Sequence, residues 1–153
     1  MTTAWEELQE FVTAEMRKVY SETTLDHAMN PRNVRNMENA DGFGTVTGPC
    51  GDTMEMWLRV KNDRILEATF MTDGCGTTIA AGSMVTEMVK GETISRILGI
   101  SQEDVLKALG GLPEESQHCA KLAADTLKEA VKDYLAFRNE PWKRAYRRDS
   151  SAR

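Results

Sequence analysis

Apolar residues recur at two different spacings along the first half of the chain. Over residues 4–20 they are separated by steps of three and four, with charged residues between them, so this segment is predicted to form an amphipathic helix. Over residues 54–60 every second residue is apolar, which is typical of a half-buried strand. A second strand is predicted over residues 65–72, and the Asn62-Asp63 pair between the two predicts an antiparallel hairpin.

A short strand precedes this hairpin, and helices follow it. The strand is predicted over residues 43–47, and helical spacing returns at Thr77. The helices predicted from there cover residues 77–90, 93–98, 105–109 and 116–137. Strands followed by helices are typical of an α+β domain. We therefore predict a small three-stranded antiparallel sheet with helices packed on one face and an extra N-terminal helix.

The composition is ordinary for a globular domain. The chain has 153 residues, of which 41% are hydrophobic and 28% charged, and this length supports one hydrophobic core. The longest nearly uncharged stretch, Gly74 to Thr86, is shorter than the roughly 20 apolar residues of a membrane helix. The first residues are partly acidic and contain no basic or apolar segment, so no secretory signal or transit peptide is expected. These features predict a cytoplasmic protein without membrane contact.

The charge is distributed unevenly. The net charge is −5, but residues 138–153 hold six basic and two acidic side chains, so this tail carries +4 and the rest of the chain −9. An acidic body does not suit a phosphate backbone, so no nucleic-acid partner is expected. The basic tail is interpreted as a solvated chain end.

The three cysteines lie where the apolar pattern breaks. Cys50 lies in a glycine-containing loop between two strands, Cys75 lies between two glycines at a strand-to-helix turn, and Cys119 follows His118 at the start of the last helix. An odd number of cysteines without a signal segment is not a disulfide framework. Because a helix start favours a thiolate, we expect Cys119 to be reactive or a ligand.

The cysteines have neighbours that could complete a metal site. His118 offers an imidazole nitrogen, and Asp52 offers a carboxylate two residues after Cys50. Three sulfurs with one nitrogen or oxygen donor suit tetrahedral zinc or an iron–sulfur cluster. The alternative is structural: free cysteines are often small buried apolar residues, His118 could be a capping histidine and Asp52 a turn residue.

Other chemically interesting residues are interpreted as structural. His27 has no cysteine near it in the sequence. The methionines at strand or helix core spacing are interpreted as packing residues, and they are Met54, Met56, Met84 and Met88.

A series of short motifs resembles a known family. The motifs are Tyr20-Ser21-Glu22, Asp26-His27, Asn30-Pro31-Arg32-Asn33-Val34, Cys50-Gly51-Asp52, Gly74-Cys75-Gly76, Ala80 to Ser83, Thr86-Glu87, His118-Cys119, Leu122-Ala123 and Asp133-Tyr134. Their order and spacing, over residues 20–134, resemble the IscU/NifU N-terminal family of iron–sulfur cluster assembly scaffolds. The resemblance implies an α+β scaffold that builds a [2Fe–2S] cluster and hands it on, and not an enzyme.

The resemblance also implies roles for individual residues. Cys50, Cys75 and Cys119 match the thiolate ligands, and Asp52 and His118 are the candidates for the fourth position. Cys119 matches the cysteine that accepts persulfide sulfur from a cysteine desulfurase of the IscS/NifS type, and Asp52 is expected to assist release of the cluster. The implied partners are this desulfurase and apo iron–sulfur proteins.

The resemblance extends to one further residue but fails at one motif. Tyr20 matches a family tyrosine associated with contacts in a homodimer. Bacterial and mitochondrial members often carry Leu-Pro-Pro-Val-Lys before the His-Cys pair, whereas residues 112–117 read Leu-Pro-Glu-Glu-Ser-Gln, so the sequence recognised by a dedicated Hsp70 chaperone is largely absent. The resemblance divides the chain into an N-terminal helical extension (1–19), a scaffold domain (20–137) and a basic C-terminal tail (138–153).

Two other functions are compatible with the same residues. One is a zinc-binding sulfur acceptor of the SufU type, but those proteins carry an insertion between the second and third cysteines, and the 44-residue separation here is short. The other is an interaction domain lined by thiols and lacking metal. Zn²⁺ is also expected to compete for the thiolates of a true scaffold in its cluster-free form.

Overall fold

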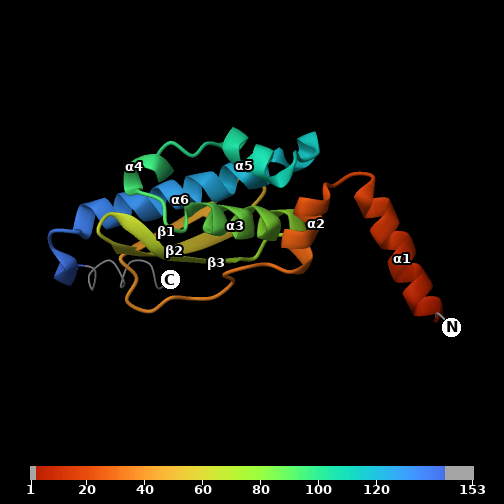
Figure 1. Cartoon of the computed structure of the whole chain (residues 1–153), viewed down its shortest axis with the longest axis horizontal. Helices are drawn as coiled ribbons and strands as arrows, with labels where there is room; N and C mark the ends of the chain where they lie inside the picture. Colours follow the sequence, from red (N-terminus) through yellow and green to blue (C-terminus); the bar gives the residue numbers. More distant parts are fainter. Residues whose placement is uncertain (1–2, 144–153) are drawn as a thin grey trace.

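The computed structural model, which describes residues 3–143, places one small sheet beside several helices (Figure 1). The strands are β1 (Gly42–Thr47), β2 (Thr53–Lys61) and β3 (Arg64–Thr72), antiparallel and in the order β1-β2-β3. The helices are α1 (Ala4–Arg17), α2 (Glu22–Met29), α3 (Gly76–Val89), α4 (Ile94–Ile97), α5 (Gln102–Leu109) and α6 (Gln117–Phe137), with short 3₁₀ turns η1 (Glu114–Ser116) and η2 (Pro141–Lys143).

The alternation of β2 divides the sheet into two faces. Met54, Met56 and Leu58 are fully buried on one face. Trp57 lies on the other, paired in register with Phe43 at a ring-centroid distance of 5.4 Å, and both rings are half-buried. The predicted half-buried strand is confirmed, as is the packing role of Met54 and Met56.

Helices α3 and α6 cover the buried face of the sheet, α6 over β1 and β2 and α3 over β3. The approach of β1 to α6 depends on glycine. A Cβ atom at Gly44 would lie 2.5 Å from the backbone nitrogen of Ala130 and 2.7 Å from the carbonyl oxygen of Thr126. The predicted α+β architecture, with helices packed on one face, is therefore confirmed, and β1 rests almost directly on the backbone of α6.

Replacing Gly44 by alanine should destabilise the fold, because backbone atoms of α6 cannot move aside without separating β1 from its helix. We expect a loss of about 1–3 kcal/mol or more in the free energy of unfolding. Urea denaturation measures this loss. Gly99→Ala is the matched control, because its new Cβ would meet its nearest atom at an ordinary 3.5 Å. Equal midpoints for the two variants would contradict this packing.

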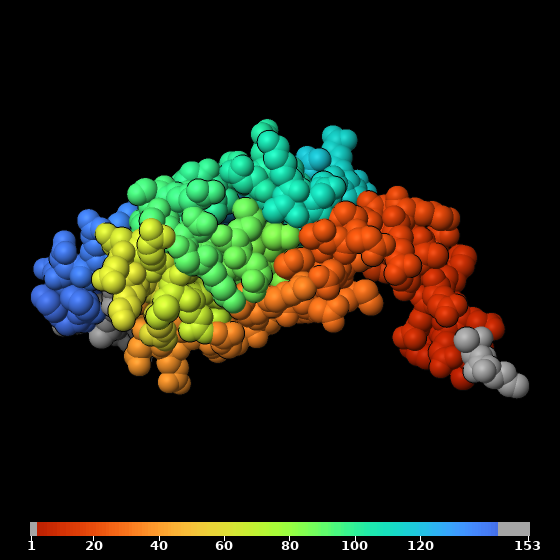
Figure 2. Space-filling view, in the orientation of Figure 1, coloured from red at the N-terminus to blue at the C-terminus, as the bar shows by residue number. Residues whose placement is uncertain are grey.

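The N-terminal helix α1 is confirmed, but it packs less than its amphipathic pattern suggests. None of its residues is buried, and Trp5 keeps 65% of its surface exposed. The helix extends away from the other elements (Figures 1 and 2). It ends at Arg17 instead of residue 20, and Tyr20 packs at the edge of the core.

His27 joins α2 to α3. Its Nδ1 lies 2.7 Å from the hydroxyl oxygen of Ser83, and the backbone N–H of Arg32 donates to the same oxygen at 2.9 Å. The side chain of His27 is 7% exposed, and burial lowers its pKa from the ordinary 6.5. These contacts agree with the structural interpretation of His27.

The C-terminal part of the chain is described only in part. Of the tail predicted over residues 138–153, residues 144–153 lie outside the described range. Within residues 3–143, no helix combines the length and apolar character needed to cross a membrane.

Candidate metal centre

The candidate ligands come from three loops or helix starts at one edge of the sheet. Thr47 at the end of β1 pairs with Thr53 at the start of β2, and Thr72 at the end of β3 pairs with Met54. The β1–β2 turn and the segment after β3 therefore lie together. The first turn of α6 lies at the same edge, because the hydroxyl of Thr78, just after β3, contacts both Cys119 of α6 and Asp52 of the β1–β2 turn.

Five side chains meet at this edge, and we call them the cysteine site: Cys50, Asp52, Cys75, His118 and Cys119. The ligand atoms of Cys50, Asp52 and His118 all lie within 4.8 Å of one another. His118 Nε2 also lies 3.7 Å from Cys119 Sγ. Cys50 and His118, which are 68 positions apart in the sequence, are thus adjacent in space.

Thr78 completes the cysteine site and was missed in the sequence. Its hydroxyl donates to Asp52 Oδ2 at 3.2 Å, and its oxygen lies 3.3 Å from Cys119 Sγ and 3.8 Å from Cys75 Sγ. A signal was available. Cys75 is the N-cap of α3, and a side chain three residues after an N-cap lies beside it.

The environments of the cysteines differ strongly. Cys50 and Cys75 are exposed, whereas Cys119 is 2% exposed and belongs to the hydrophobic core. Cys119 therefore lies within the apolar face of α6, and the expectation that every cysteine breaks the apolar pattern is wrong for this residue.

The two helix-start cysteines have opposite pKa shifts. Hydrogen bonding from the backbone of Thr78 is the main cause that lowers the pKa of Cys75 below 9.0. Burial is the main cause that raises the pKa of Cys119 above 9.0, with further contributions from nearby Cys75, Asp52 and Cys50. The expected preference for thiolate at a helix start is wrong for Cys119 in the cluster-free protein, because desolvation outweighs it.

The difference between these thiols predicts their order of alkylation. In the metal-free protein iodoacetamide should modify Cys75 at least severalfold faster than Cys119, because Cys75 is exposed and more readily ionised. Peptide mass spectrometry after timed quenching measures the two rates. In urea the rates should converge, which serves as the control. Faster modification of Cys119 in the folded protein would refute this assignment of environments.

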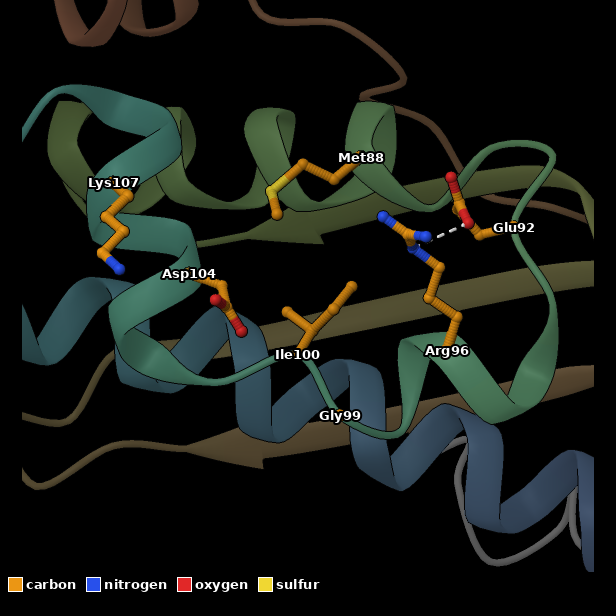
Figure 3. A pocket seen from close by; sticks show the side chains of 7 residues that line it. All are labelled: Met88, Glu92, Arg96, Gly99, Ile100, Asp104 and Lys107. Atoms are coloured by element: carbon orange, nitrogen blue, oxygen red, sulfur yellow. Dashed lines mark ion pairs between the residues drawn. The ribbon is translucent and has the colours of Figure 1, made fainter.

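Two hollows on the described surface lie at opposite ends of α3. One, of about 240 Å³, is lined by Cys75 itself together with Met16, Tyr20 and Leu25. The other, of about 420 Å³, lies at the end of α3 remote from Cys75 (Figure 3). Its lining includes Glu92, which pairs with Arg96 at 3.0 Å.

The acidic groups of the second hollow already have partners within the protein. Asp104 accepts hydrogen bonds from the backbone N–H and the hydroxyl of Ser101 in the capping box of α5. Met88, predicted as a core residue, is half-buried and lines this hollow. The cysteine site is therefore the better candidate for metal chemistry.

The chemistry of the donors fits an iron–sulfur cluster or a zinc ion. Three sulfurs supply soft ligands, and a carboxylate and an imidazole are available for the remaining position. The site lies at the edge of the sheet with two of its cysteines exposed. A metal group held there would be accessible from solvent.

Comparison with known proteins identifies the class. The family model of the NifU-like N-terminal domain matches residues 19–141, which include the whole cysteine site. The chain belongs to this family. The match begins after α1, so this helix lies outside the part that the family model describes.

Individual relatives agree with this assignment. The chain is 50% identical over 118 residues to a protein of Archaeoglobus fulgidus named iron–sulfur cluster assembly scaffold protein IscU 1, covering 76% of this chain and 77% of the relative. It is 43% identical over 124 residues to the scaffold protein IscU of Escherichia coli, covering 78% of this chain and 96% of the relative. The resemblance noted in the sequence is therefore confirmed.

A solved structure supports the fold. The N-terminal part of a NifU-like protein from Brucella abortus superposes with a TM-score of 0.64 at 17% identity, covering 79% of this chain and 97% of that structure. At this identity the similarity concerns the fold alone.

Proposed function

We propose that this protein is a scaffold on which a [2Fe–2S] cluster is assembled and from which it is passed to apo-proteins. The convergence of Cys50, Cys75 and Cys119 with Asp52 and His118 is the observation that carries the proposal. The relatives named as IscU scaffolds support it. In this account the cluster is cargo, and the protein holds it temporarily.

The ligand set accounts for temporary binding. The three thiolates hold the iron, and Asp52 and His118 compete for the fourth position because their ligand atoms lie within 4.8 Å of each other. A carboxylate is a harder and more exchangeable ligand than a thiolate. The fourth ligand is thus the most weakly bound of the four, and its displacement begins the transfer of the cluster; we call this the weak-corner mechanism.

The sulfur comes from a cysteine desulfurase, and Cys119 receives it. The sulfur atom of Cys119 attacks the outer sulfur of the persulfide on the desulfurase, and the S–S bond of that persulfide breaks. A new S–S bond forms on Cys119, and the departing cysteine sulfur takes up the proton that Cys119 loses, so no net oxidation occurs. Because Cys119 is 2% exposed, the cysteine site has to open when the desulfurase binds.

Two further parts of the proposal concern the molecule outside the site. The scaffold domain spans residues 20–137, with the helical extension before it and the basic tail after it. A homodimer forms through contacts that include Tyr20, which is half-buried beside Cys75 in the free chain.

Metal and sulfide analysis tests the proposal. After anaerobic purification, or reconstitution with iron, cysteine and a desulfurase, we expect iron and acid-labile sulfide in equal amounts. Zinc without sulfide after both procedures would instead favour a sulfur acceptor of the SufU type, since the same donors suit tetrahedral zinc. Unchanged folding and activity after chelation would favour an interaction domain without metal.

A further inference from the structure

Thr78 has one hydroxyl proton and three possible partners. The carboxylate of Asp52 can only accept, so the hydroxyl proton points to Asp52 Oδ2, 3.2 Å away. The lone pairs of the same oxygen face Cys119 Sγ at 3.3 Å, where they can accept from the thiol. The hydroxyl of Thr78 therefore links the Asp52 side of the cysteine site to the buried sulfur.

The position of Thr78 is fixed from several sides. The residue is 0% exposed in the first turn of α3, and its branched side chain has few rotamers available. Gly74 leaves room for it, because a Cβ there would lie 2.7 Å from both carbon atoms Cβ and Cγ2 of Thr78. A hydroxyl held this firmly can direct a less buried neighbour.

Asp52 is such a neighbour. It is half-buried and follows Gly51, whose φ of +92° places a tight turn immediately before it. Without a partner inside the site, its carboxylate would turn to solvent, since water solvates a charged oxygen better than a protein edge does. The bond from Thr78 opposes that rotation.

We propose that Thr78 is a positioning residue that holds the Asp52 carboxylate in the cysteine site, so that Asp52 takes the fourth ligand position ahead of His118. The inference rests on the proposed function. Groups that hydrogen-bond to a metal ligand commonly set its orientation, and their loss changes metal affinity or activity by roughly 10- to 100-fold. Removing the hydroxyl of Thr78 should therefore reproduce the loss of Asp52 itself.

The test uses Co²⁺ alone as a spectroscopic probe of the fourth ligand. Thr78→Val removes the hydroxyl while keeping the shape, and Thr78→Ser keeps the hydroxyl. We expect the visible Co²⁺ spectrum of Thr78→Val to match that of Asp52→Ala, and that of Thr78→Ser to match the unmodified protein. Thr126→Val is the matched control, because Thr126 is a buried helical threonine whose hydroxyl donates to Leu122 O at 2.7 Å in α6.

Cluster transfer gives a second readout. Thr78→Val should slow transfer to an apo-ferredoxin about tenfold, and the double variant with Asp52→Ala should be no slower than Asp52→Ala alone, since both changes remove the same ligand. Thermal unfolding checks that each variant is folded. Thr78→Ala removes the hydroxyl without adding volume and replaces the valine variant if that protein does not fold.

The outcomes separate the inference from the proposed function. A Thr78→Val spectrum equal to that of the unmodified protein, or shifted no more than that of Thr126→Val, would overturn the role of Thr78 and leave the scaffold proposal intact. An unchanged spectrum in Asp52→Ala would also overturn the role of Thr78, because Asp52 would then not be a ligand. Absence of sulfur-to-cobalt absorption in the unmodified protein would overturn the proposed metal site and the inference together.

Discussion

Replacement of Cys119 by serine should abolish the uptake of persulfide sulfur. A serine oxygen cannot accept sulfur from a persulfide, because the transfer requires a sulfur nucleophile that forms a new S–S bond. After incubation with a cysteine desulfurase and cysteine, mass spectrometry of the unmodified protein should show the added mass of one sulfur atom on the peptide that contains Cys119. The variant should show none.

Cys50→Ser is the control for this experiment. Cys50 is an exposed member of the same site, so its replacement perturbs metal binding without removing the proposed acceptor. We expect Cys50→Ser to keep sulfur uptake on Cys119. Sulfur arriving on Cys119→Ser at the rate seen with the unmodified protein would refute Cys119 as the acceptor. Such a result would move the role to exposed Cys75, whose pKa is lowered.

Replacement of Asp52 by alanine should make the protein retain its cluster longer. Without the carboxylate, the imidazole of His118 is left within reach of the fourth position, and it is a better ligand for iron than an exchangeable oxygen. We expect transfer to an apo-ferredoxin to slow by roughly tenfold, which corresponds to about 1.4 kcal/mol in the barrier. Loss of the visible absorbance of the cluster on the scaffold measures the rate.

Asp125→Ala provides the matched control for the charge. Asp125 is an acidic residue on α6 that pairs with Lys121 at 2.7 Å and takes no part in the cysteine site. Removing it changes the net charge by the same amount, so we expect its transfer rate to equal that of the unmodified protein. Equal or faster loss of the cluster in Asp52→Ala would contradict the weak-corner mechanism.

Periodicity was sufficient to predict the sheet and most helices. The alternation over residues 54–60 indicates which side chains of β2 are buried, and the turn at Asn62-Asp63 requires an antiparallel partner. Both residues of that turn adopt positive φ, as the turn demands. The ends of the predicted strands and helices differ from the observed ends by one to a few residues.

Periodicity was not sufficient to say what an apolar face contacts. Residues of α1 repeat at helical spacing, yet Leu8 and Phe11 are exposed by 53% and 63%. The segment before β1 gave no strand signal, although Val34 forms a parallel bridge with Phe70 of β3. Such contacts depend on tertiary neighbours, which a pattern within one segment does not contain.

The cysteine site also combines features that the sequence pattern predicts with features that only tertiary contacts determine. Its cysteines stood out because of their glycine and histidine neighbours, and the topology explains why they meet. Its spacing, three residues after the N-cap Cys75, could have placed Thr78 beside that cysteine, but only the structure shows that its hydroxyl also reaches Asp52 and Cys119. The raised pKa of Cys119 also required the structure, because burial is a property of the whole core.

X-ray absorption of the zinc-loaded protein tests the central claim most directly. If Cys50, Cys75 and Cys119 bind one metal centre, the zinc edge data should require three sulfur neighbours at about 2.3 Å and one lighter neighbour at about 2.0–2.2 Å. Replacing any of the three cysteines by serine should reduce the sulfur count by one. A first shell with fewer than three sulfurs in the unmodified protein would contradict the convergence on which the scaffold proposal depends.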